Sequence, residues 1–222
     1  MNGDFFENYH FEYVIIENIE RHFIDNIQNI GFKKSLSLTE LNKLVEIKSK
    51  HNKNDFAYNS VLKFPYYAIK YKLNKTYLFN GKVYKTQISK NLFSVNNNQL
   101  LFYYRDISST RLNNENMNVN NLNNILNDLN DMLLKKDIKL VVLAAPDKYD
   151  VYYDYIVDKH DFPRPLFFEQ MKKCNKKYIW INSKEVISSH INQKKDLYFY
   201  DDTHWSPWVS QLIADEIKMV TN

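Results

Sequence analysis

The residues best suited to chemistry gather near the C-terminus, in the run Asp201-Asp202-Thr203-His204-Trp205. A carboxylate two or three positions before a histidine, in a turn that leads into a helix, can lie beside the imidazole ring. It then fixes the tautomer of the ring and stabilises its protonated form, while the other ring nitrogen acts as a base. The spacing also leaves open a plainer interpretation, in which the aspartate caps the next helix and the histidine simply packs against its neighbours.

Other charged residues follow apolar runs that are typical of buried strands. Glu20 and Arg21 come soon after one such run, and Lys148 comes just after another. Open α/β sheets place their chemistry beyond the carboxyl ends of their strands. Lys148 could bind an anionic or sugar group there, or it could be a solvated lysine in a turn. Glu20 with Arg21, and Arg105 with Asp106, are interpreted first as structural ion pairs.

The composition excludes several classes of site. Only 3 glycines are present and none belongs to a Gly-rich phosphate loop, so nucleotide-binding enzymes of the two common loop types are not expected. The single cysteine, Cys174, excludes an internal disulfide framework and a multi-cysteine zinc site. The remaining histidines lack the spacing of metal ligands. We therefore expect neither a cofactor nor a metal.

Charge and hydropathy narrow the range of partners. The chain has 30 Lys and Arg against 26 Asp and Glu, and this excess of +4 is spread along its length, so no nucleic acid partner is expected. No apolar run approaches the roughly 20 residues that span a bilayer. The first residues show neither a basic region nor a clean apolar region, so we expect no signal peptide and no membrane span.

The periodicity of apolar residues predicts strands that alternate with helices. The helical pattern is clearest at 119–133, and Ser206 with Pro207 is typical of the N-cap and first position of a closing helix. Another helix is predicted at 166–173. Such alternation indicates a parallel sheet with helices on both faces. The predicted strands are 13–16, 139–145 and 178–181.

Residues 31–100 have a different pattern. A capping box at 37–40 predicts a helix that runs to about residue 49, and Asn80-Gly81 is a strong hairpin signal between two short strands. A further strand is predicted at 100–104. We therefore expect a single domain over residues 1–222 in which 31–100 is a mixed α+β insertion that contains an antiparallel hairpin.

Four stretches together resemble the SGNH hydrolase superfamily, in the branch of alginate O-acetyltransferases and related polysaccharide acetylation proteins. The most specific stretch is Tyr198-Phe199-Tyr200-Asp201-Asp202-Thr203-His204-Trp205, with a strand before it and an amphipathic helix after it. The resemblance covers residues 100–220 well, 10–25 in part, and 31–95 hardly at all. The three supporting stretches are 139–152, in which a strand ends in Pro146-x-Lys148 and a tyrosine follows, 101–106, and 13–21.

The resemblance implies a three-layer α/β/α fold and acetyl-ester chemistry on a cell-envelope or secreted polysaccharide, by an O-acetyltransferase or an acetylesterase. In that chemistry a serine attacks the acyl group, His204 takes the serine proton, and Asp202 orients His204. Asp201, three positions before the histidine, is the rival for the role of Asp202. The residues expected to bind substrate are Lys148, Arg105, Trp205 and Tyr152.

The sequence departs from this family at the nucleophile. The family carries it in a Gly-Asp-Ser block at the end of a strand, whereas Gly3-Asp4-Phe5 has a phenylalanine in place of the serine and no strand before it. We expect the nucleophile turn to be absent from this chain, and we interpret Ser206 as a cap. Three hypotheses remain: an enzyme that is active when complete, an inactive carbohydrate-binding or assembly module, and an unrelated α/β domain in which Asp202 is a helix cap.

The missing nucleophile strand bears on the partners. A parallel sheet without that strand would expose an edge or a face, so we expect a homodimer or a partner subunit to cover that surface. A polysaccharide or an acetylated sugar is the other expected partner. The resemblance also implies a location outside the cytoplasm, in the periplasm or cell envelope.

Overall fold

A computed structural model describes residues 10–28, 83–95 and 98–222 of the chain. The chain divides into two compact units, and the unit considered below comprises Glu12–Ile30 and Gly81–Asn222. The other unit, Met1–Phe11 with Gly31–Asn80, lies almost wholly outside the described residues. The predicted helix at 37–49 and the predicted hairpin at Asn80-Gly81 therefore lie outside them too.

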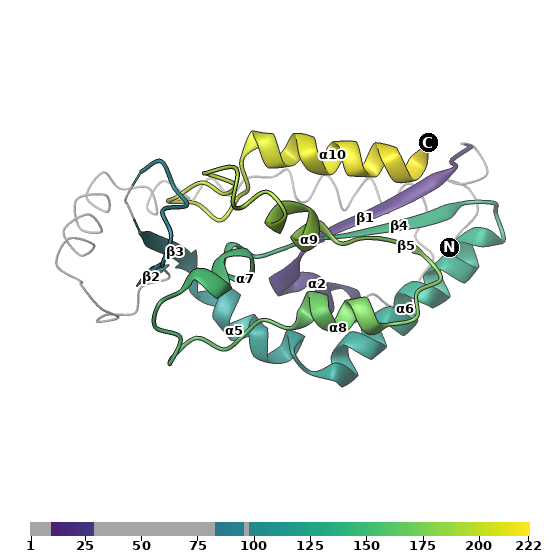
Figure 1. Ribbon diagram of the computed structural model, residues 1–222. Coiled ribbons are helices and arrows are strands. Elements are labelled where there is room, and N and C mark those ends of the chain that lie inside the picture. The colour runs from purple at the N-terminus through teal and green to yellow at the C-terminus, as the bar shows by residue number, and fades with distance from the viewer. Residues whose placement is uncertain (1–9, 29–82, 96–97) are drawn as a thin grey trace, which may run out of the picture. The chain divides into compact units, whose positions relative to one another are not determined.

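A parallel sheet forms the centre of this unit (Figure 1). It contains β1 (Tyr13–Ile19), β4 (Lys139–Ala145) and β5 (Ile179–Ile181) in the order β1-β4-β5. Tyr13 pairs with Lys139 and Ile19 with Ala145, so β1 and β4 end at the same level. The middle strand, β4, is almost continuously apolar and its residues 140–144 are buried, as expected for a strand covered on both faces. The three predicted strands are confirmed.

Helices cover both faces of this sheet (Figure 1). On one side lie α2 (Glu20–Gln28), α6 (Asn116–Leu134) and α8 (Phe167–Lys173), and on the other lie α9 (Ser183–Ser188) and α10 (Pro207–Thr221). Helix α6 buries apolar residues three and four positions apart, which is the pattern that predicted it. The mixed α/β class expected from the sequence is confirmed. The other helical segments in the described part of the chain are α5 (Tyr104–Asn113), α7 (Lys148–Tyr152) and the 3₁₀ turn at Tyr153–Tyr155.

An antiparallel pair stands apart from the main sheet. Strand β2 (Val83–Gln87) pairs with β3 (Gln99–Tyr103), and the rings of Tyr84 and Phe102 stack with centroids 5.6 Å apart. The strand predicted at 100–104 ends one residue early, because Tyr104 begins α5. The Asp106 carboxylate accepts the backbone N–H of Tyr103 at 3.3 Å, which caps the helix at that point.

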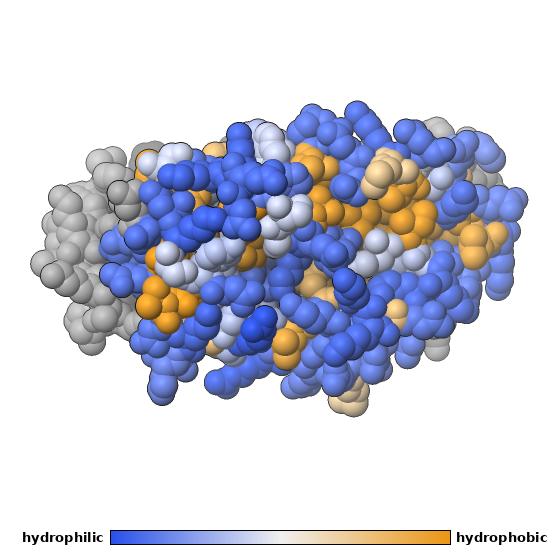
Figure 2. All heavy atoms as spheres, in the orientation of Figure 1, coloured by the Kyte–Doolittle hydropathy of each residue, from blue (hydrophilic) through white to orange (hydrophobic). Residues whose placement is uncertain are grey.

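The surface beside β5 is partly apolar. Figure 2 shows apolar side chains gathered where β5, α9 and α10 meet, and a groove there is lined in part by Trp180, Val186 and Val220. Among the described residues, β5 is the last strand on this side of the sheet. None of the helices in the described ranges combines the length and the hydropathy needed to cross a membrane.

Candidate active site

The Asp-x-His run lies at the tip of a small hairpin. Tyr198 forms a β-bridge with Trp205, and the backbone N–H of Phe199 donates to the carbonyl of His204 at 3.1 Å. Tyr198 is buried, and its hydroxyl donates to the carbonyl of Pro146 at 2.6 Å, just beyond the end of β4. The hairpin is thereby fixed to the carboxyl end of the central strand, where a parallel sheet places its chemistry.

At this tip, His204 and Asp202 face each other. The Nδ1 atom of His204 lies 2.7 Å from Oδ1 of Asp202, and their side chains are 75% and 52% exposed. The same carboxylate oxygen accepts the backbone N–H groups of Thr203 and His204. Partial burial alone would raise the pKa of the Asp202 carboxyl, but the hydrogen bonds from the His204 ring and from these two amides outweigh it and lower the pKa. The ring is therefore held through Nδ1, and Nε2 is the nitrogen that can take a proton.

The geometry separates the interpretations that spacing left open. Asp202 bonds the histidine ring, whereas Asp201 is exposed and makes no hydrogen bond to His204 in the described part of the chain. The Asp202 carboxylate binds amides of its own turn and not those of α10. Ser206 does occupy the N-cap position of α10, but its hydroxyl makes no capping bond.

The four residues expected to bind substrate lie in very different surroundings. Lys148 is 1% exposed, and its ammonium donates to three backbone carbonyls of the hairpin. Tyr152 is fully buried between the rings of Phe93 and Tyr198. Because both side chains are enclosed by protein, their present conformations offer no surface to a substrate.

Arg105 and Trp205 are more accessible. Arg105 is exposed, and its Nε donates to the hydroxyl of Tyr104 at 3.1 Å. Trp205 is partly buried and packs against the core, one position after His204. Of the four expected residues, Trp205 is the one that adjoins the histidine in an accessible position.

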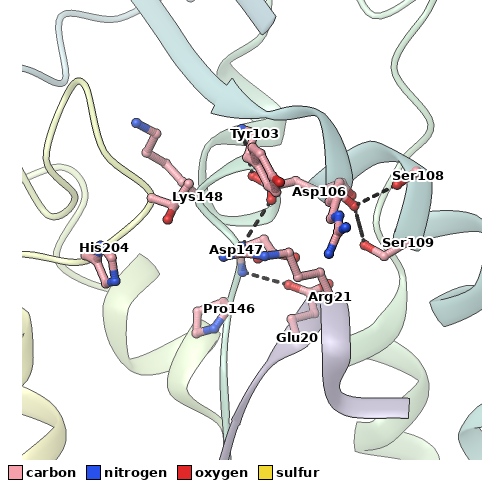
Figure 3. Close-up of polar contacts among 12 residues, drawn as sticks. Glu20, Arg21, Tyr103, Asp106, Ser108, Ser109, Pro146, Asp147, Lys148 and His204 are labelled. Carbon is pink, nitrogen blue, oxygen red and sulfur yellow. Dashed lines mark hydrogen bonds and ion pairs between the residues drawn. The ribbon is translucent and has the colours of Figure 1, made fainter. Parts of the chain in front are cut away.

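A cluster of buried charges lies at the ends of β1 and β4, to one side of His204 (Figure 3), and sequence patterns identified only some of its members. Arg21 pairs with Asp106 at 3.1 Å and also with Asp147, and its guanidinium lies over the Tyr103 ring. Glu20 accepts the backbone N–H of Asp147 at 2.9 Å. The expected pairing of Arg105 with Asp106 is wrong, because Asp106 points inward to Arg21 while Arg105 points to solvent.

Burial dominates the protonation of this cluster. It raises the pKa of Asp106 to about 6, against the opposing charge of Arg21. Burial and the neighbouring Asp106 charge raise the pKa of Asp147, and burial with the charge of Asp150 raises that of Glu20. Sequence patterns did not identify Asp147 as a site residue. Its position directly after Pro146, at the end of a predicted strand, could have indicated it. The cluster links the end of β1 with the end of β4 and with the first turn of α5.

The described serines do not complete the site. Ser108 and Ser109 donate to the carbonyl of Arg105 within their own helix, and Ser183 is buried and donates to the carbonyl of Ala144. Over residues 10–28, 83–95 and 98–222, no serine donates a hydrogen bond to His204. Within the same ranges, no group of three or more His, Cys, Asp or Glu side chains could hold a metal ion.

Comparison with known proteins identifies a family for this part of the chain. Residues 97–221 match a family model described as "SGNH hydrolase-like domain, acetyltransferase AlgX". The match spans β3, β4, β5, the charge-bearing helices α5 and α7, and the hairpin with its closing helix. No curated protein and no solved structure matches the chain significantly.

Proposed function

The chain belongs to the SGNH hydrolase-like domain family of the acetyltransferase AlgX, and from this premise we propose that it carries out acetyl-ester chemistry. The reaction is transfer of an acetyl group to a polysaccharide, or its hydrolysis from one. The observation that carries the proposal is the Asp202–His204 pair, with Nδ1 held at 2.7 Å and Nε2 left for proton transfer.

In this reaction the pair acts as the general base. His204 Nε2 takes the proton of a serine hydroxyl as its oxygen attacks the acetyl carbonyl, and Asp202 stabilises the imidazolium that forms. When the tetrahedral intermediate collapses, the bond to the leaving alkoxide breaks and the imidazolium returns the proton to that alkoxide. The serine then carries the acetyl group. Transfer to a sugar hydroxyl, or to water, repeats these steps with the acceptor as the nucleophile.

Labelling with a fluorophosphonate probe tests this proposal, with mass-spectrometric mapping of the labelled residue. Labelling of one serine in the wild-type chain that His204→Ala abolishes would support the proposal, and it would identify the nucleophile that the described residues do not supply. His160→Ala is the matched control, because His160 is also an exposed histidine beside an aspartate, at 3.1 Å from Asp161. Acetyl-ester hydrolysis that survives His204→Ala would contradict the proposal.

A second candidate is an inactive carbohydrate-binding or assembly module. The observation that favours it is that no serine among the described residues donates a hydrogen bond to His204. Binding of an acetylated polysaccharide without labelling or turnover would support this candidate. If neither binding nor turnover is found, both candidates fail.

We also propose a partner at the β5 edge and a location outside the cytoplasm. An edge strand leaves backbone N–H and C=O groups unpaired, β5 is such a strand among the described residues, and the partly apolar groove beside Trp180 adjoins it. A strand from a second copy or from a partner subunit would pair with this edge. Sedimentation that shows only a monomer at high concentration would exclude the second copy.

A further inference from the structure

Lys148 contacts the hairpin that carries His204 from beneath. It is the first residue of α7, three positions after the last residue of β4, and it is 1% exposed. Its Nζ atom donates to the carbonyl oxygens of Phe199 at 3.0 Å, Tyr200 at 2.8 Å and Asp202 at 2.8 Å. A single side chain thus binds three backbone groups within four residues of the hairpin.

These contacts use the whole donor capacity of the side chain. A lysine ammonium has three N–H donors and no acceptor, and here each donor has its own carbonyl. The ring of Phe93 lies 5.8 Å from Nζ and covers the cation further. In this conformation the ammonium has no N–H left for an anionic or sugar group, so its effect on chemistry must pass through the hairpin.

The three carbonyls lie where they control the catalytic pair. The backbone of Asp202 sets the direction of the carboxylate that holds Nδ1 of His204. The backbone of Phe199 is paired with His204 across the hairpin. Fixing both backbones therefore fixes the position of the carboxylate relative to the ring. A misplacement of such a pair by about 1 Å is enough to lose much of a catalytic effect.

We propose that Lys148 is a positioning residue whose ammonium fixes the hairpin backbone so that Asp202 holds the Nδ1–H tautomer of His204. The proposal deepens the proposed function of the Asp202–His204 pair and rests on it. It replaces the substrate-binding role expected from the sequence.

The surroundings of Lys148 make its hydrogen bonds to the hairpin sensitive to pH. Burial lowers the pKa of Lys148 to about 8, against the raising effects of Asp106 in α5 and of Asp202 and Asp201 in the hairpin. Arg21 in α2 also faces this region through its pair with Asp106. A neutral amine has two N–H donors and a lone pair, so above pH 8 one of the three carbonyls loses its donor. The positioning therefore weakens as pH rises through about 8.

Nitrogen-15 NMR of histidine-labelled protein tests the proposal without any assay of activity. At pH 7 the neutral form of the His204 ring should be mainly the Nδ1–H tautomer in the wild-type chain. In Lys148→Met we expect the Nε2–H tautomer of a free imidazole to predominate, and the amide of Phe199 to exchange with solvent at least about tenfold faster. Lys184→Met is the matched control, since Lys184 is a partly buried lysine on Asp150 and Glu169, and its His204 signals should match the wild type.

A folded Lys148→Met chain with the wild-type tautomer and exchange rate would overturn the proposal. Should that variant not fold, the wild-type chain decides. Its His204 tautomer ratio should change as rising pH removes the proton of Lys148, and a ratio that stays constant through that deprotonation would overturn the proposal. The two proposals fail separately. A tautomer change without any esterase or transferase activity contradicts only the proposed function, and activity that needs His204 but not Lys148 contradicts only the role of Lys148.

Discussion

The spacing Asp-x-His occurs twice in the described residues, at Asp158–His160 and at Asp202–His204. In both places the aspartate accepts the backbone N–H of the histidine, at 3.0 Å and 3.3 Å. The rings then differ. The ring of His160 turns to the next residue, Asp161, whereas the ring of His204 returns to the same carboxylate that holds its amide.

The difference lies in what supports each turn. The first turn lies at the surface, and its His160 and Asp161 side chains are 90% and 74% exposed. The second is tied to the end of β4 by the Tyr198 hydroxyl and by the Lys148 ammonium. The two turns share the same spacing but hold their histidine rings differently. The second is fixed by buried side chains at the carboxyl end of a parallel sheet, and the first is exposed.

The largest expected effect separates the two aspartates. Asp202→Asn should lower the rate of acetyl-ester turnover by about 10³-fold or more, because an amide stabilises the wrong tautomer of His204 and cannot stabilise its cation. Asp158→Asn should leave the rate unchanged. Hydrolysis of p-nitrophenyl acetate by the two variants measures this, and an Asp202→Asn rate within tenfold of the wild type would contradict it.

Lys148, which holds the second turn, should make the free energy of unfolding depend on pH. Lys148 has a pKa of about 8 in the fold against an ordinary 10.5, so between these values the unfolded chain binds a proton that the folded chain lacks. The free energy of unfolding should therefore rise with pH over this range, by up to about 3 kcal/mol. Urea unfolding of wild type and Lys148→Met from pH 7.5 to 10 measures the difference. The rise should be lost in Lys148→Met and kept in Lys184→Met.

A smaller effect is expected at Glu20, in the charge cluster at the ends of β1 and β4. Its pKa is raised by burial and by the charges of Asp150 and Asp147, so its contribution to stability is present at low pH and is lost as pH rises above the ordinary 4.5. Glu20→Gln keeps an oxygen for the Asp147 amide and removes the charge. It should raise the free energy of unfolding at pH 7 by about 1–2 kcal/mol. A destabilised Glu20→Gln chain at pH 7, or one with an unchanged pH profile, would contradict this.

The smallest effect is expected at the first turn. Asp161→Asn removes the ion pair with His160, and exposed pairs contribute little to stability. We expect the Tm to change by less than about 1 °C. A larger shift in a calorimetric scan would mean that the first turn also has a buried support.

Sequence patterns predicted most of the described fold because its main elements depend on local apolar spacing. The runs that form β4 and α6 are strongly periodic, and both elements were found where expected. Pairing partners could not be predicted in this way. The partner of Asp106 proved to be Arg21, which lies 85 positions away. No local pattern could show that Asp106 pairs with Arg21 and not with the adjacent Arg105.

The candidate site was predictable in its residues but not in their roles. Spacing allowed both Asp201 and Asp202, and the choice follows from the hairpin register that pairs Phe199 with His204. The sequence marked Lys148 and Tyr152 as site residues, but it could not show that α7 turns both side chains inward. Their burial is a property of tertiary packing that residue type does not reveal.

The pairing of β1 with β4 has a consequence for how the chain folds. Arg21 and Asp147, at the ends of these strands, are 126 positions apart, whereas the segment from α6 through β4 to α7 is local. Contacts between distant positions close large loops and slow the folding reaction. We expect α6 and β4 to associate early and β1 to dock late, so a folding intermediate with an open β4 edge precedes the native state. Until β1 docks, the unpaired N–H and C=O groups of that edge can pair with another chain, which favours aggregation.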